Sequence, residues 1–241
     1  MIDVLNSAGN RWVTMRTIFV GDVHGCATEL QELLTKVSFN PSADRLLWTG
    51  DAFSKGPEPM EVWKLIRQLQ PDMVLGNHDD RLMRQLRKHR DSHRPSFKHA
   101  EQELLFSTML PQSSEVLDWL ESLPLFVDEE QFLLVHAGIN PEFGLRGTSR
   151  KEFLTIRTWP PTDSIEGSRW HDAYDHPTRQ VLVFGHDAPM GLVARRDPAN
   201  AMRIVGLDSG CVYGGQLSAF ILEEECIVQV NSGQPNNFDD R

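Results

Sequence analysis

The sequence predicts an α/β protein, because strand-like and helix-like segments alternate in its first half and strand-like segments dominate its second half. Three β-rich stretches, Thr17–Val20, Arg45–Trp48 and Asp72–Leu75, are separated by segments long enough for helices. Such spacing is typical of parallel βαβ units. The chain has 241 residues, of which 40% are apolar, so it can build one large core. We therefore expect a single α/β domain over residues 15–230.

Two helices are predicted between these strands, and a helical region follows them. Apolar residues with helical spacing run from Leu30 to Val37. Pro57–Gln70 carries a second apolar stripe and begins with a proline, which suits a first helical turn. Residues 79–123 have a mainly helical pattern, and we expect them to form a small cap-like insertion.

The rest of the chain is predicted to consist of strands joined by one long irregular segment. The expected strands are Leu125–Val127, Phe132–His136, Val181–His186, Arg203–Leu207, Leu217–Leu222 and Cys226–Val230. Leu145–Pro177 is the least regular part, and we expect an ordered excursion over the functional site. Residues 1–14 are expected to be a flexible extension, and the polar tail 231–241 is expected to be disordered.

Composition argues against several classes of function. A net charge of -10 disfavours duplex nucleic acid, which needs a basic face, but not a nucleotide, because bound metal ions reverse the local field. No stretch approaches the ~20 apolar residues of a membrane span. The three cysteines, Cys26, Cys211 and Cys226, are too few for a disulfide framework. We therefore expect them to be small apolar fillers in a cytoplasmic protein.

Five predicted strands end in glycine-flanked residues that can bind a metal ion. The segments are Gly21-Asp22-Val23-His24-Gly25, Gly50-Asp51, Gly76-Asn77-His78-Asp79, Val135-His136-Ala137-Gly138 and Phe184-Gly185-His186-Asp187. Because the carboxyl ends of parallel strands share one edge of a sheet, these side chains are expected to converge. A single Asp or His after a strand is most often a cap, but five such ends are hard to explain as caps. The predicted metal ligands are Asp22, His24, Asp51, Asn77, His136 and His186.

The donor types indicate which ions this site binds. Carboxylate, imidazole and amide oxygen without thiolate suit Mn²⁺, Fe, Co or Zn, and we take Mn²⁺ as the first choice. Two ions about 3.5–4 Å apart need a bridging carboxylate, and Asp51, central in the series, is the natural bridge. Such a pair lowers the pKa of a shared water and binds phosphoryl oxygens. We therefore expect two divalent ions and phosphoryl chemistry.

The order GDVHG, GDAFSKGP, GNHD, VHAG and FGH resembles the calcineurin-like metallophosphoesterases of the phosphoprotein-phosphatase type. The motifs run from Gly21 to His186. This resemblance implies a four-layer α/β/β/α sandwich with mixed central sheets and a small helical cap. It implies that the first ion is held by Asp22, His24 and Asp51, and the second by Asp51, Asn77, His136 and His186.

The same resemblance assigns roles in catalysis and in substrate binding. Asp51 and His78 are implied as catalytic residues, with His78 as the general acid beside the leaving oxygen. The implied substrate-binding residues are Lys55, Asn77 and Arg157. Protein phosphatases of the family have Asp-Arg where this chain has Ser54-Lys55, so Asp79 or a water is left to orient His78. Lys55 can bind a phosphate only as a point charge, which counts against a dedicated protein phosphatase.

A second resemblance narrows the expected substrate. The segment Gly206–Leu217, with its Leu-Asp-Ser-Gly-Cys and Gly-Gly motifs, resembles the corresponding part of the symmetrical diadenosine tetraphosphate hydrolases. It implies attack by a metal-bound hydroxide and symmetrical cleavage of diadenosine tetraphosphate to two ADP. Asp208 is either a partner of a metal-binding histidine or an ordinary turn residue. Two alternatives stay open: a serine/threonine or broad-specificity phosphatase, and a non-catalytic nucleotide-binding module.

Two further groups of side chains have both a functional and a structural interpretation. The segment after the third motif is locally basic and contains Arg81, Arg84, Lys88 and Lys98. It is either a solvated helix face or a track that steers a polyphosphate towards the metal ions. Aromatic residues in the irregular segment either stack on a base or pack that segment down, and packing is favoured. These residues are Trp159, Trp170 and Tyr174.

Overall fold

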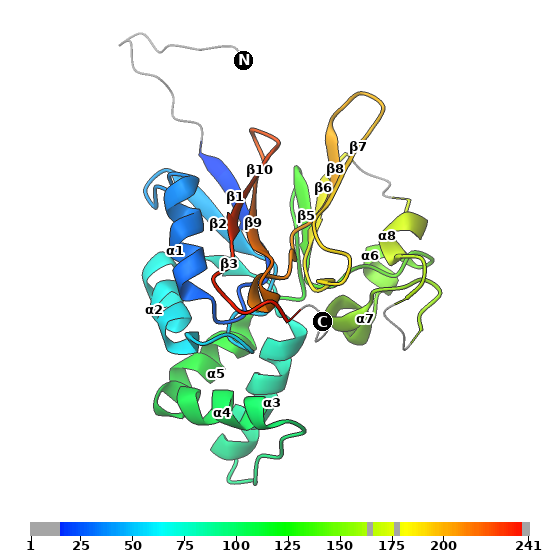
Figure 1. Ribbon diagram of the computed structural model, residues 1–241. Coiled ribbons are helices and arrows are strands. Elements are labelled where there is room, and N and C mark those ends of the chain that lie inside the picture. Colours follow the sequence, from blue (N-terminus) through cyan, green and yellow to red (C-terminus); the bar gives the residue numbers. More distant parts are fainter. Residues whose placement is uncertain (1–14, 163–165, 176–178, 238–241) are drawn as a thin grey trace.

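Two five-stranded sheets lie face to face, and helices cover the outer face of each (Figure 1). The computed structural model describes residues 15–162, 166–175 and 179–237, so the predicted extension 1–14 lies outside the described residues. The helices beside the first sheet are α1 (Ala27–Lys36) and α2 (Pro59–Leu69), and those beside the second are α6 (Gly144–Gly147), α7 (Arg150–Thr155) and α8 (Trp170–Ala173). The predicted four-layer α/β/β/α arrangement is confirmed.

Both sheets are mixed, and each contains three parallel strands. The first has the order β10-β9-β1-β2-β3, in which β1, β2 and β3 are parallel. Its strands are β1 (Arg16–Val20), β2 (Asp44–Trp48), β3 (Asp72–Met73), β9 (Gln216–Ile221) and β10 (Cys226–Asn231). The second has the order β4-β5-β6-β8-β7, in which β5, β6 and β8 are parallel. Its strands are β4 (Phe126–Asp128), β5 (Phe132–Val135), β6 (Val181–Phe184), β7 (Val193–Arg196) and β8 (Met202–Gly206).

The two sheets are joined by a continuous apolar layer. Phe19 of β1 packs edge-on against Phe132 of β5, with 4.9 Å between ring centroids, and also stacks on Phe220 of β9. All three rings are buried. Because this layer fixes the two sheets against each other, it also fixes the relative positions of the strand ends.

A group of helices lies at one end of the molecule and accounts for most of residues 79–123, which were predicted to be mainly helical (Figure 1). It contains α3 (Asn77–Arg90), α4 (Ala100–Met109), the 3₁₀ turn η1 (Leu110–Gln112) and α5 (Ser113–Ser122). Helix α3 begins at Asn77, two residues earlier than the start of the insertion, so its first turn carries two predicted site residues. None of the helices described combines the length and the hydropathy that a membrane span requires.

Three segments differ from the sequence prediction. Strand β7 was not predicted, because its sequence Val-Ala-Arg-Arg lacks an apolar run, as suits an edge strand. The segment 145–177, predicted to be irregular, contains the short helices α7 and α8 among its described residues. The tail, predicted to be disordered from residue 231, has a defined course in its described part, residues 231–237. Glu29 holds it there, because Gly233 N and Gln234 Nε2 each donate to its Oε1 at 3.0 Å.

His171, in the first turn of α8, is a buried histidine whose two ring nitrogens have no hydrogen-bond partner among the described residues. Burial, reinforced by Arg195, lowers its pKa from 6.5 to about 4. The folded protein therefore keeps this ring neutral, whereas the unfolded chain takes up a proton below about pH 6.5. The contribution of His171 to the free energy of unfolding therefore has its full value above about pH 6.5. Below that pH it decreases, by up to about 3 kcal/mol as the pH falls towards about 4.

We expect His171→Phe to remove this part of the pH dependence, since phenylalanine does not titrate and the ring lies beside Trp170 and Phe184. Denaturant unfolding at pH 7.5, 6 and 5 measures the free energy of unfolding of both proteins. As the pH falls, the free energy of unfolding should decrease less for the variant than for the wild type. His93→Phe, at an exposed position, is the control and should follow the wild type. Parallel pH curves for wild type and His171→Phe would contradict the assignment.

Candidate metal centre

The six predicted metal ligands lie together where strands of both sheets end. Asp22 and His24 follow β1, Asp51 follows β2, Asn77 begins α3 after β3, His136 follows β5, and His186 follows β6. All six are buried, with at most 7% of any of them exposed. The convergence expected from five glycine-flanked strand ends is therefore present, with ligands from both sheets.

The ligand atoms form two groups that share one residue. Those of Asp22, His24 and Asp51 lie within 4.8 Å of one another, as do those of Asp51, His136 and His186. The oxygen Oδ2 of Asp51 is 3.6 Å from Nε2 of His24 and 3.6 Å from Nε2 of His136. This oxygen is equally close to a histidine of each group, so Asp51 could serve as a ligand to two ions.

Asn77 and His186 complete the second group. The amide oxygen of Asn77 is 3.1 Å from His136 Nε2 and 3.1 Å from His186 Nδ1. His186 Nε2 is buried and has no partner among the described residues. Carboxylate, amide and imidazole groups gathered in one buried space are the environment that a divalent ion satisfies. The residues present therefore fit the expected ions.

Neighbouring groups fix the orientation of these ligands. Thr49 Oγ1 donates to Asp22 Oδ1 at 2.6 Å, and the Thr49 carbonyl lies 2.8 Å from His136 Nδ1. Ser54 Oγ lies 2.8 Å from His24 Nδ1. Contacts of this kind set the ring orientation of metal-binding histidines. Neither role was predicted from the sequence, in which Ser54 was noted only as a replacement for the Asp that would orient His78.

The electrostatics of the site favour a bound cation. Burial, together with Asp208 and Asp51, raises the pKa of Asp22 well above its ordinary value. Burial lowers the pKa of His24 and of His186, so that both rings are neutral, the form that binds metal. A divalent ion would offset the repulsion between the buried carboxylates and use the lone pairs of the neutral rings.

The backbone is strained at three of the ligands. His24, Asp51 and His186 have φ values of 47°, 54° and 67°, in the left-handed region that side chains rarely adopt. Such strain persists only where the surrounding structure enforces it, and it is concentrated at functional sites. Gly76 shows how tight the packing is, because a Cβ there would lie 2.1 Å from Asp51 Oδ1.

His78 lies next to the first group and remains partly exposed. Its ring meets that of His24 edge-on at 5.2 Å, and its backbone N–H donates to Asp51 Oδ1 at 2.8 Å. Burial lowers its pKa to about 4, with a contribution from Lys55, against the opposing effect of Asp51. Asp79 does not hydrogen-bond to this ring in the part of the chain described; its carboxylate accepts from the backbone N–H of Ala52 at 3.1 Å.

Two predicted substrate-binding cations lie at the rim of the site. Lys55 donates to the hydroxyl of Tyr213 and sits 4.8 Å from the centre of its ring. Arg157 donates to the His186 carbonyl at 3.1 Å and lies 3.6 Å from Asp187 Oδ1. Tyr213 was missed from the sequence, although it belongs to the glycine-rich segment Gly206–Leu217 that was singled out there.

A cavity of about 470 Å³ opens at His78 and Lys55 and extends between α3 and α4. Its apolar wall includes Leu82, Phe97 and Leu105, and its polar wall includes Arg81, Arg84, Lys98 and His99. Much of the basic run therefore faces a cavity beside His78. Lys88 is instead exposed and donates to Ser96.

The remaining candidates have structural positions. Trp170 is 1% exposed and packs on Phe184, and a Cβ at Gly138 would meet its ring at 2.3 Å, so its predicted packing role is confirmed. Asp208 accepts from the backbone N–H of Gly210 at 3.2 Å, as a turn residue does. Burial raises the pKa of Asp208 to about 6, and Asp51 adds to this effect.

Comparison with known proteins identifies the family. Residues 15–208 match the model of the calcineurin-like phosphoesterases. A Dechloromonas aromatica protein named symmetrical bis(5'-nucleosyl)-tetraphosphatase is 28% identical over 90% of this chain and 96% of its own length. A crystal structure provisionally assigned as a diadenosine tetraphosphatase has a TM-score of 0.72 at 31% identity, over 92% of this chain and 95% of that one. A Saccharomyces cerevisiae protein serine/threonine phosphatase, at 15% identity and TM-score 0.59 over 96% and 83%, shares the fold. The chain therefore belongs to the calcineurin-like phosphoesterases and is a hydrolase of that family.

Proposed function

We propose that this hydrolase uses two metal ions and cleaves dinucleoside tetraphosphates symmetrically, so that diadenosine tetraphosphate gives two ADP. The observation that carries the proposal is the cavity that opens beside His78 and Lys55, whose lining carries Arg81, Arg84, Lys98 and His99 against one acidic residue, Glu101. The Dechloromonas aromatica relative with this named activity aligns with 90% of the chain.

Asp22, His24 and Asp51 would hold one ion, and Asp51, Asn77, His136 and His186 the other. Bound divalent ions would polarise the phosphoryl oxygens and lower the pKa of a coordinated water. Mn²⁺ is the first ion to test, and Fe, Co and Zn suit the same donors. We place the reaction in the cytoplasm, because Cys26, Cys211 and Cys226 are all free thiols.

The residues at the rim would bind and protonate the phosphate chain. Lys55 and Arg157 lie beside the two ligand groups and Asn77 belongs to the second group, and all three can donate to phosphoryl oxygens. His78 would give a proton to the leaving phosphate oxygen. Its pKa, lowered by burial in the free protein, would rise as an anionic phosphate chain enters beside it.

A dinucleoside tetraphosphate has a nucleoside at each end of its phosphate chain. The cavity suits the half of the substrate that extends away from the metal centre, here called the second nucleotide arm. Its volume of about 470 Å³ lies in the range of small-molecule pockets, about 300–1,000 Å³. Among the described residues, neither Arg81 nor Lys98 forms an ion pair, so both charges are available to phosphates; Arg84 is paired with Asp80. The apolar wall with Phe97 offers a surface for a base. A flat phosphoprotein surface would leave this cavity unused.

A side-by-side assay of the Mn²⁺-loaded protein tests the proposal. The substrates are diadenosine tetraphosphate, a phosphoserine peptide and an aryl phosphate, and nucleotide products are separated by chromatography. We expect ADP as the only nucleotide product, without AMP and ATP. Rapid release of phosphate from the peptide while the dinucleotide stays intact would instead favour a protein phosphatase.

We expect Arg81→Ala and Lys98→Ala each to raise KM for the dinucleotide about tenfold, since a charge-assisted hydrogen bond contributes about 1.5–3 kcal/mol. Hydrolysis of an aryl phosphate, which has no second nucleotide to place in the cavity, should change much less. Arg87→Ala is the matched control, because Arg87 lies on the same helix and pairs with Glu121 at 2.7 Å. Equal losses on both substrates would mean that the cavity does not bind the nucleotide arm.

A further inference from the structure

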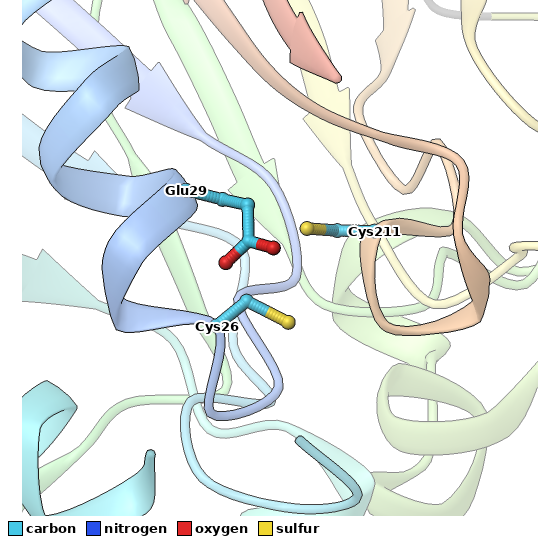
Figure 2. Close-up of side chains that lie close together, drawn as sticks. All are labelled: Cys26, Glu29 and Cys211. Atoms are coloured by element: carbon cyan, nitrogen blue, oxygen red, sulfur yellow. The ribbon is translucent and has the colours of Figure 1, made fainter. Parts of the chain in front are cut away.

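Cys26, Glu29 and Cys211 form a second cluster of possible metal ligands, beside the N-terminus of α1 (Figure 2). Their ligand atoms lie within 4.8 Å of one another. Figure 2 shows the Glu29 carboxyl group and both sulfur atoms directed into the same space. The three side chains are 0%, 3% and 2% exposed, respectively. This cluster is separate from the nitrogen and oxygen donors of the metal centre.

The carboxylate of Glu29 is only half satisfied. Its Oε1 accepts from Ser232 Oγ at 3.4 Å, Gly233 N at 3.0 Å and Gln234 Nε2 at 3.0 Å. Its Oε2 is buried and has no hydrogen-bond partner among the described residues. A buried carboxylate oxygen without a partner is costly, so the arrangement indicates a missing cation or donor.

No side chain in the described part of the chain supplies that cation, because no Lys, Arg or His there forms an ion pair with Glu29. The groups nearest to it in the cluster are instead two thiols, Cys26 and Cys211. Two sulfur ligands and one carboxylate oxygen are the donors that a soft or borderline ion prefers. Zn²⁺ and Cd²⁺ fit this combination better than Mn²⁺ does.

We propose that Cys26, Glu29 and Cys211 bind a thiophilic divalent cation, with Zn²⁺ as the expected ion. Both cysteines would bind as thiolates and release their protons to solvent as the ion enters. Structural zinc sites have four ligands, so the three side chains leave one position for water or a main-chain oxygen. This site does not depend on the proposed substrate.

The position of the cluster gives the ion a clear structural effect. Cys26 is two residues from His24, and Cys211 is two residues from Tyr213, which holds Lys55. Glu29 holds the C-terminal segment through Gly233. An ion at this point would join the loop after β1, the turn η2 (Cys211–Tyr213) and the C-terminal segment.

Cadmium is a suitable probe, because its thiolate complexes absorb in the ultraviolet. The protein is saturated with Mn²⁺, kept reduced with a non-thiol reductant and titrated with Cd²⁺; bound metal is counted after gel filtration. We expect the thiolate absorbance to saturate at one Cd²⁺ per chain, in wild type and in Asp51→Asn alike. Protein refolded with Cd²⁺ present controls for slow entry. If neither preparation acquires thiolate absorbance, the proposal is wrong.

Variants assign the ligands. Cys211→Ser should abolish the absorbance. Glu29→Gln, which keeps both thiols, should weaken Cd²⁺ binding about 100-fold or more, since even indirect partners of a ligand contribute about 10–100-fold. Cys226→Ser removes the exposed cysteine and should bind Cd²⁺ like the wild type. Unchanged binding by Glu29→Gln, or loss of binding in Cys226→Ser, would overturn the assignment.

Discussion

Asp51→Asn is expected to lower kcat/KM for diadenosine tetraphosphate by at least about 10³-fold, the upper end of the effect of losing one preorganised electrostatic group. The reason is the shared position of Asp51 Oδ2, 3.6 Å from a histidine nitrogen of each ligand group. Asparagine keeps the shape and can still accept the His78 backbone N–H through Oδ1, but it removes the charge. Both ions therefore lose their common ligand.

Metal analysis after dialysis separates this effect from a change in folding. Wild type should retain two ions per chain, and Asp51→Asn should retain fewer. Asp118→Asn, at an exposed position, is the matched control and should keep both metal and activity. Two tightly bound ions and near-normal turnover in Asp51→Asn would exclude Asp51 as the bridge.

His78→Asn is expected to leave metal content unchanged and to lower kcat for the dinucleotide by about 10²–10⁴-fold, the usual contribution of a general acid. Its ring contacts His24 but belongs to neither ligand group. Its backbone N–H, which Asp51 accepts, is retained in the variant. The ring is therefore not needed for the geometry of the ligands.

The leaving group distinguishes acid catalysis from a positioning effect. An aryl phosphate with a good leaving group needs little protonation, so its hydrolysis should be affected much less than that of the dinucleotide. His93→Asn is the control: His93 is exposed and follows α3, the helix that carries His78, and the variant should hydrolyse both substrates at the wild-type rate. Equal losses on both substrates would show that His78 acts by position alone.

The site was predictable because its ligands are tied to strand ends. In GDVHG, GNHD and VHAG, a strand, a glycine and a donor side chain follow one another within a few residues, so local sequence carries the signal. Parallel pairing then brings the ends together, as the register Val20↔Trp48 shows for the first two strands. The placement of the ligands is seen in the structure, and their metal-binding roles stay predictions.

What the sequence did not reveal depends on contacts between distant segments. Ser54 contacts His24, and Tyr213 contacts Lys55. Each contact joins two loops that are brought together by the packing of the complete fold and not by their own sequences. Strand β7 was missed because its pairing with β8, and not its own residues, makes it a strand. The hydrogen bond from Gly233 N to Glu29 also joins segments far apart in the sequence, so no local pattern predicts it.

The division of the ligands between two sheets has a consequence for stability. Asp51 stands at the end of a strand of the first sheet and His136 at the end of a strand of the second, and their side chains approach within 3.6 Å. Ions held by both would add cross-links to the apolar packing and to polar contacts such as that of Thr49 with His136, which already join the two layers. Metal occupancy and the cooperativity of unfolding would then be linked, so that loss of the ions loosens the contact between the two halves of the sandwich.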